Sequence, residues 1–70
     1  MSEPLTCSAK ACRETATTAL LWNNPRLHDA DRRKVWLGCD THAVTLAEFL
    51  SLRGFLRDRV PVDEIPAGAG

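Results

Sequence analysis

The stretch that decides the fold is CDTH, residues 39–42, which places a thiol and an imidazole two residues apart. It follows the apolar run VWLG at 35–38 and precedes a segment with helical periodicity. A Cys and a His at this spacing can turn toward one ion and supply half of a tetrahedral zinc site. The other two ligands must come from a distant part of the chain.

The remaining cysteines of the chain, Cys7 and Cys12, provide the second half of the ligand set. Three thiols cannot all pair within one chain, and the cytoplasm keeps thiols reduced. With Cys39 and His42 they complete a set of four ligands, so the sequence predicts one Zn²⁺ per chain as the cofactor. Iron is also compatible with a thiolate-rich tetrahedral site, and the choice between the two metals stays open.

Two other interpretations of these residues stay open beside the zinc site. The thiols can simply be small core residues, with His42 on the surface. His28 is a rival fourth ligand, although the loop that carries it is expected to point away from the metal. The Cys three positions before His42 makes His42 the better-placed ligand.

Length and charge set the class of protein. Seventy residues predict a single domain at 1–66 with a disordered tail at 67–70. A chain this short buries only about 60% of its unfolded surface, so a metal is a plausible staple. Nine basic and nine acidic residues balance, which argues against a strong non-specific binder of nucleic acid or membranes.

The sequence predicts a cytoplasmic protein with no membrane partner. Its apolar runs are only a few residues long, too short to span a bilayer. The segment at 1–10 carries an early acid and no apolar stretch of the kind that a secretory signal needs.

An antiparallel hairpin is expected between the two halves of the ligand set. TATTALLW at 15–22 is rich in Thr and apolar residues, and KVWLG at 34–38 is a second short strand. The Asn- and Asp-rich stretch at 23–33 has the composition of a loop. Pairing of the strands would bring Cys12 and Cys39 together at the open end of the hairpin.

A short helix is expected after His42. It starts near Asp40, or at Thr45 if the T-x-x-E pattern at 45–48 is a capping box, and it stops before Gly54. Such a short helix is marginal alone, so it must pack on the hairpin. The residues expected to do so are Leu46, Phe49 and Leu50.

FLRDRVPV at 55–62 predicts a third strand at the edge of the sheet, because Pro61 lacks an N–H. The expected fold class is therefore a small α+β zinc-bound domain. It combines a zinc knuckle, a β-hairpin, one short α-helix and this possible edge strand.

The order of knuckle, hairpin, second ligand pair and helix resembles the treble-clef type of zinc finger over residues 7–54. The resemblance implies that Cys7 and Cys12 are the knuckle pair, and that Cys39 and His42 lie at the start of the helix. Treble clefs usually place two residues between the knuckle ligands, whereas this chain has four. The knuckle is therefore expected to be wider.

C-x4-C, WNNPRLH at 22–28, CDTH and FLSLRGFL at 49–56 also resemble a group of small bacterial proteins. Some of those carry the name acetone carboxylase. That activity is not carried over, because a ketone carboxylase must activate bicarbonate with a nucleotide. This chain has no Gly-rich phosphate-binding loop.

The expected function is structural. A fourth protein ligand closes the site to water, whereas a catalytic zinc keeps an open position, so we expect no enzyme activity. Ligation needs thiolates, so metal binding should weaken as pH falls. The domain would act as a small interaction module with a protein partner.

The alternative function is a nucleic-acid-binding zinc finger. It would use two tryptophans as a stacking platform beside a locally basic hairpin loop, which Asp29 and Asp31 dilute. Ordinary packing of the tryptophans is the competing interpretation. The candidate contacts are Trp22, Arg26, Arg32, Arg33, Lys34 and Trp36.

Overall fold

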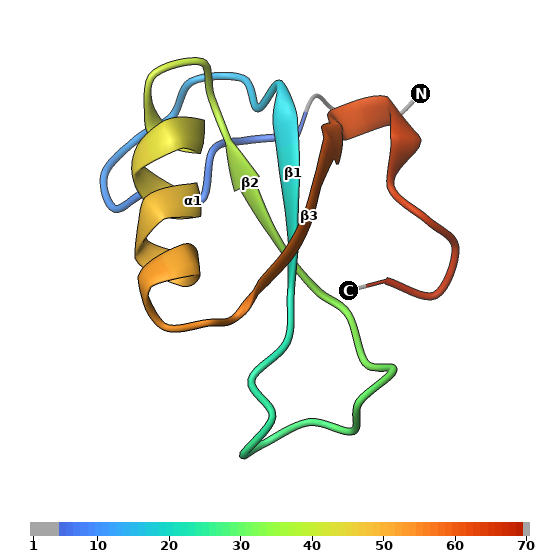
Figure 1. Ribbon diagram of the computed structural model, residues 1–70. Helices are drawn as coiled ribbons and strands as arrows, with labels where there is room; N and C mark the ends of the chain where they lie inside the picture. The colour runs from blue at the N-terminus through green and yellow to red at the C-terminus, as the bar shows by residue number, and fades with distance from the viewer. Residues whose placement is uncertain (1–4, 70) are drawn as a thin grey trace.

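The computed structural model describes residues 5–69 and contains a small sheet with one helix against it (Figure 1). In chain order the elements are β1 (Thr18–Trp22), β2 (Lys34–Gly38), α1 (His42–Leu52), β3 (Leu56–Pro61) and a 3₁₀ turn, η1 (Val62–Glu64). Residues 1–4 of the predicted N-terminal loop, and Gly70 of the predicted tail, lie outside the described residues.

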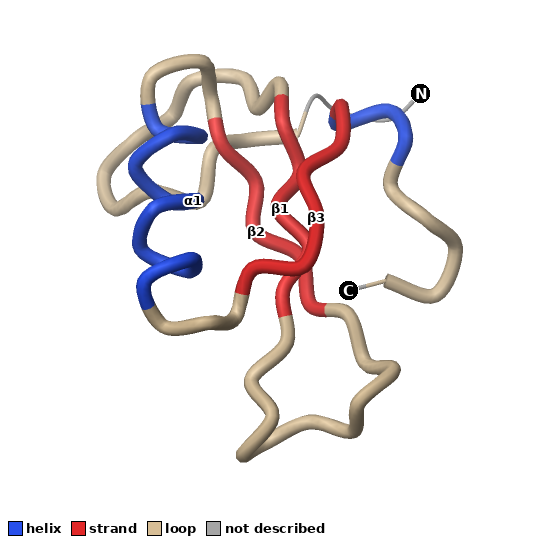
Figure 2. The backbone as a smooth tube through the Cα atoms, in the orientation of Figure 1, coloured by secondary structure: helices blue, strands red, loops and turns tan. Residues whose placement is uncertain are grey.

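The sheet is antiparallel, with strand order β2-β1-β3 (Figure 2). Leu20 of β1 lies opposite Trp36 of β2 on one side and opposite Arg59 of β3 on the other. As the central strand, β1 is covered on both faces, which explains its continuous apolar run in place of an alternating one. The hairpin and the third, edge strand of the sequence analysis are confirmed.

The core lies between the sheet and α1 (Figure 1). Leu20 of β1 meets Ala47 and Leu50 of α1 at its centre, and all three are buried. Partly buried side chains surround them: Trp22, Trp36, Leu46, Phe55 and Leu56. Leu46 and Leu50 thus pack as predicted, whereas Phe49 stays 43% exposed and contacts the sheet by stacking on Trp36.

The second face of β1 is also buried. Ala19 and Leu21 point away from α1 by strand alternation, and both are almost inaccessible to solvent. After β3 the chain passes through η1 and runs along the side of the sheet opposite α1 (Figure 1). Residues 66–69 form a turn, in which the Ala69 N–H donates to the Pro66 carbonyl at 3.2 Å. Disorder of residues 67–70 stays a prediction.

At both edges of the sheet, some of the outward-facing backbone N–H and C=O groups are hydrogen-bonded within the chain or are absent. At β2 the Leu37 carbonyl accepts from the Ser8 N–H at 2.7 Å, and the Leu37 N–H donates to Ser8 Oγ at 2.9 Å. On β3 the Arg59 N–H donates to Asp58 Oδ1 at 2.8 Å, and Pro61 has no N–H. Such devices prevent an edge strand from pairing with another chain.

The boundaries of the strands follow the sequence closely. The second strand has the predicted bounds, and β3 is one residue shorter at each end than the predicted 55–62. β1 begins at Thr18, later than the predicted 15, because Thr15 forms a separate bridge with Thr6. The N-terminal segment thus takes the pairing that an extended hairpin would have used.

The predicted capping box at the start of the helix is wrong. α1 begins at His42, its N-cap residue Thr41 makes no side-chain capping bond, and Thr45 lies inside the helix. The turn from Cys39 to His42 leads into the helix instead, because the Ala43 N–H donates to the Cys39 carbonyl at 2.8 Å. The predicted stop is confirmed: Gly54 has φ +73°, which favours glycine.

Candidate metal centre

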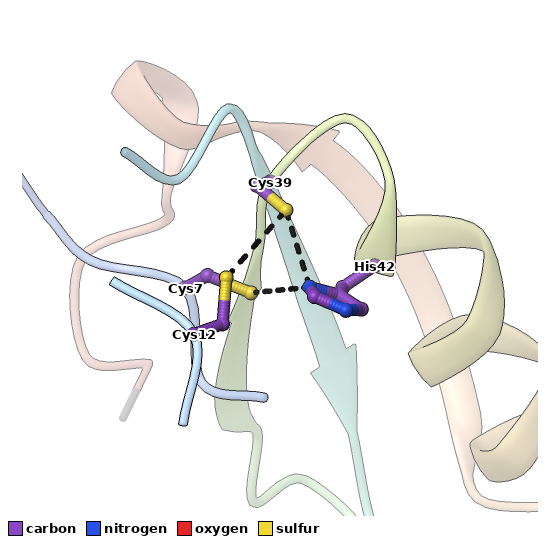
Figure 3. A group of neighbouring side chains, drawn as sticks. All are labelled: Cys7, Cys12, Cys39 and His42. Carbon is purple, nitrogen blue, oxygen red and sulfur yellow. Dashed lines mark hydrogen bonds between the residues drawn. The ribbon is translucent and has the colours of Figure 1, made fainter. Parts of the chain in front are cut away.

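Four side chains from three separate segments converge at one end of the sheet (Figure 3). Cys7 and Cys12 come from the N-terminal loop, Cys39 follows β2, and His42 is the first residue of α1. Their possible ligand atoms all lie within 4.8 Å of one another. The structure therefore brings together the four residues that the sequence analysis proposed.

The separations between these atoms fit a tetrahedral zinc ion. The His42 Nδ1 lies 3.3 Å from the Cys39 Sγ and 3.6 Å from the Cys7 Sγ. The Sγ atoms of Cys12 and Cys39 are 4.0 Å apart. Zinc bonds of about 2.3 Å to sulfur and about 2.0 Å to nitrogen give edges of roughly 3.8 Å between sulfurs and 3.5 Å between sulfur and nitrogen. The donor set thus fits the ion in chemistry and in spacing.

Backbone bonds hold the knuckle pair against the sheet. The Cys7 N–H donates to the Glu14 carbonyl at 2.9 Å, next to the bridge between Thr6 and Thr15. The Cys12 N–H donates to the Ala9 carbonyl at 3.1 Å and closes the turn between the ligands. The hydrogen bonds between Ser8 and Leu37 of β2, described above, hold the same loop beside Cys39.

The four-residue spacer of the knuckle includes a strained residue. Ala11 has φ +63°, the only positive φ of a residue other than glycine in the described part of the chain. The left-handed conformation costs an L-residue with a Cβ about 1–2 kcal/mol. This turn lets the wider knuckle direct both of its thiols to the same point.

Close packing fixes the turn that carries the second ligand pair. A Cβ added to Gly38 would lie 2.7 Å from the Cα of Ala43, so only glycine lets the end of β2 pass this close to α1. Asp40 Oδ1 accepts a hydrogen bond from the Thr17 hydroxyl at 2.8 Å, which ties the turn to the residue before β1.

The thiols differ in their tendency to ionise. Burial opposes ionisation of Cys7, but hydrogen bonds from the Ala9 and Cys39 N–H groups and from the neighbouring thiols outweigh it and lower its pKa. For Cys12 the Glu14 N–H favours the thiolate. Desolvation and the competing Cys7 and Cys39 sulfurs nevertheless raise its pKa. A divalent cation would relieve this competition because it favours every thiolate at once.

The rival ligand His28 lies outside this cluster. Its Nδ1 accepts the Asn24 N–H at 3.0 Å, and its ring packs edge-on against Trp22 at 5.6 Å between centroids. Both contacts are at the loop between β1 and β2, at the other end of the sheet. His28 therefore stabilises that loop, and His42 is the imidazole of the cluster.

The six candidate nucleic-acid contacts lie in several different surroundings. The rings of Trp22 and Trp36 lie 5.3 Å apart and pack, half-buried, against the core. Arg26 lines one depression, whereas Arg32 and Arg33 line another, with acidic residues and the C-terminal segment. Lys34 lies opposite Trp22 in the sheet. A contact of these residues with nucleic acid stays a prediction.

In comparisons with known proteins, no family model, curated protein or solved structure matches the chain. The resemblances to treble-clef fingers and to the small bacterial proteins stay predictions. Within residues 5–69, no helix has both the length and the apolar character needed to cross a membrane.

Proposed function

We propose that this chain is a structural zinc module, in which one Zn²⁺ bound by Cys7, Cys12, Cys39 and His42 holds the fold together. The observation that supports the proposal is the convergence of four donor atoms, from three segments, at separations typical of tetrahedral zinc. The ion would join the N-terminal loop, the end of β2 and the start of α1. We also propose that this arrangement is of the treble-clef type.

We propose further that the module has no catalytic activity. Catalytic zinc sites generally have three protein ligands and an open position for water. Here four protein donors are available, and Cys7 and Cys39 are only 5% and 6% exposed. A closed site of this kind contributes to folding and leaves no position for a substrate. Its role in the cell would be to present the surface of the module to a protein partner.

The first experiment is elemental analysis of protein purified without added metal, together with native mass spectrometry. We expect one zinc per chain. One iron per chain would leave the proposed ligands unchanged but would show that zinc is the wrong metal. X-ray absorption at the metal edge should then give three sulfur neighbours and one nitrogen neighbour.

The two histidines provide a matched pair of variants for the ligand assignment. His42→Ala should lower zinc affinity by more than the roughly 10- to 100-fold that loss of an outer-shell partner costs, because it removes a ligand itself. His28→Ala removes an imidazole from the far loop and should leave zinc content at one per chain. A folded protein without metal, or a zinc content that depends on His28, would contradict the proposal.

A further inference from the structure

A depression at the other end of α1 has no part in the proposed metal centre. α1 runs from His42, at the cluster, to Leu52, a length of about 16 Å. The depression lies just beyond this end, is open to solvent on one side and has a volume of about 410 Å³, within the range of small-ligand sites. Its lining residues are Asn24, Pro25, Arg26, Arg53 and Phe55.

Charge distinguishes this depression from two other hollows on the molecule. The cleft beside the metal centre has Glu14 and Asp40 as its charged residues. The cleft between the hairpin loop and the C-terminal segment has charges of both signs. Arg26 and Arg53 line the third depression, and no carboxylate of residues 5–69 lines it. The charged lining of this depression is therefore positive, which favours an anion.

The guanidinium of Arg53 lies over the Phe49 ring, with its Cζ 4.0 Å from the centroid. A cation–π contact of this kind leaves the N–H groups available as donors. Arg57 adds a third guanidinium nearby, because its Nη1 donates to the Gly54 carbonyl at 2.8 Å. A forked set of donors in this arrangement suits the oxygens of a phosphate.

An aromatic wall and an amide complete the depression. Phe55 stacks on Trp22, with 6.2 Å between centroids and 24° between ring planes, and it also lines the depression. Asn24 also lines the depression; its Oδ1 accepts the Arg26 N–H at 3.0 Å, and its NH₂ group remains available as a donor. The site therefore combines a ring for stacking, an amide for hydrogen bonding and two cations.

We propose that this depression binds one nucleotide of a single-stranded nucleic acid. The base stacks on Phe55, and the phosphate lies between Arg26 and Arg53. Bases stack on aromatic side chains while cationic residues follow the backbone, and the depression supplies both components within one small area. An acidic peptide would use the arginines alone and leave Phe55 without a role. The site differs from the tryptophan platform considered above, because Trp22 here supports Phe55 from behind.

NMR titration of the full chain as purified, with octamers of deoxythymidine and of uridine, tests the proposal without reference to the metal. We expect shifts concentrated at the amides of 24–26 and 53–55, at low salt. The affinity should fall with salt, with a slope of log affinity on log salt of about −0.7 for each phosphate contact.

Variants locate the binding and keep the test independent of folding. Phe55→Leu should weaken binding at least about fivefold, the lower end of what one stacked base contributes. Arg26→Gln and Arg53→Gln should each make the salt slope shallower by about 0.7. Arg59→Gln removes the same charge from the middle of β3 and should change the slope far less. Arg53→Lys replaces Arg53→Gln in the test if the latter does not fold. It keeps the charge but lacks the planar fork, so it should bind the octamers more weakly than the unmodified chain.

Several results would overturn the proposal. One is the absence of shifts at 24–26 and 53–55 with either octamer at low salt. Another is an Arg59→Gln variant that loses as much affinity as Arg53→Gln. Tighter binding of an acidic peptide, or an equal affinity for inorganic phosphate alone, would show an anion site with no selection for a nucleotide.

Discussion

The two ends of the molecule are packed differently. Small residues fill the metal end, defined as Cys7–Cys12 with Gly38–Ala43. Aromatic rings fill the aromatic end, defined as Trp22, Trp36, Phe49 and Phe55. The rings contact one another in series, with neighbouring centroids 5.3–6.2 Å apart: Phe55 stacks on Trp22, Phe49 stacks on Trp36, and the two tryptophans are tilted against each other by 59°. The metal end has no comparable apolar volume, and four donor atoms occupy its centre. One end is therefore held by contacts between side chains, and we propose that the other is held by an ion. Substitutions at each end should have different signatures.

Removal of the metal should have the largest effect. A structural zinc ion contributes on the order of 10–16 kcal/mol in finger peptides, comparable with the whole stability of a domain. We expect chelation to abolish the strand and helix signals in circular dichroism, and added zinc to restore them. Retention of both signals in a sample shown to be free of metal would mean that the aromatic end is sufficient to hold the fold.

Leu50→Ala should have the next largest effect, at the boundary between α1 and the sheet. Leu50 is 1% exposed and contacts the core, so truncation should cost about 2–5 kcal/mol in zinc-loaded protein. Leu52→Ala, two residues along α1, changes a side chain that is 88% exposed, and the cost should stay within about 0.5 kcal/mol. Chemical denaturation measures both. Equal losses would show that the packing on α1 differs from the arrangement described.

Gly38→Ala should damage the metal end in two ways at once. The new Cβ would lie 2.7 Å from a backbone atom of α1, so the end of β2 must move, at a cost of about 1–3 kcal/mol. Because Cys39 follows directly, zinc affinity measured against a competing chelator should fall as well. Gly54→Ala is the control: its strain arises from φ +73° in open space, and zinc affinity should not change. Equal zinc affinity in both variants would contradict this coupling.

Ala11→Gly should have the smallest effect and the opposite sign. Glycine adopts φ +63° without the steric cost that Ala pays there, so the zinc-loaded protein should gain up to about 1 kcal/mol. Ala9→Gly, in the same loop but at a negative φ, should instead lose about 0.5–1 kcal/mol. Thermal unfolding of the two variants side by side gives the comparison, and a loss of stability in Ala11→Gly would contradict the expected relief of strain.

The ligand set and the hairpin were accessible from the sequence because both depend on local spacing. The start of α1 was accessible only as two alternatives: the structure agrees with the start near Asp40 and contradicts the one at Thr45, because the turn from Cys39 to His42 overrides the capping pattern at 45–48. Asn23 lies in the predicted loop, but its burial could not be predicted. It is 2% exposed, and its amide donates to the Asp29 and Arg32 carbonyls at 2.7 and 2.8 Å. Bonds from a buried side chain to carbonyls of the same loop leave no periodic pattern in a sequence.

Pairing of strands was predictable only in part. The sequence indicated an edge strand at 55–62, but nothing in its pattern selects β1 as its neighbour over β2. That choice follows from the N-terminal segment, since Ser8 occupies the outer edge of β2 at Leu37. Pro61 and the bond between Arg59 and Asp58 then leave β3 suited to an edge position.

The hydrogen bonds between Ser8 and Leu37 would link the proposed metal to the solubility of the protein. Ser8 directly follows Cys7, so loss of the proposed ion would also release the segment that lies against Leu37. As the chain unfolds, the residues of β2 would lose this cover, and their N–H and C=O groups could pair with a strand of another copy. Self-association should therefore increase with chelator and with protein concentration together, and metal-depleted stocks should form aggregates rich in β-structure.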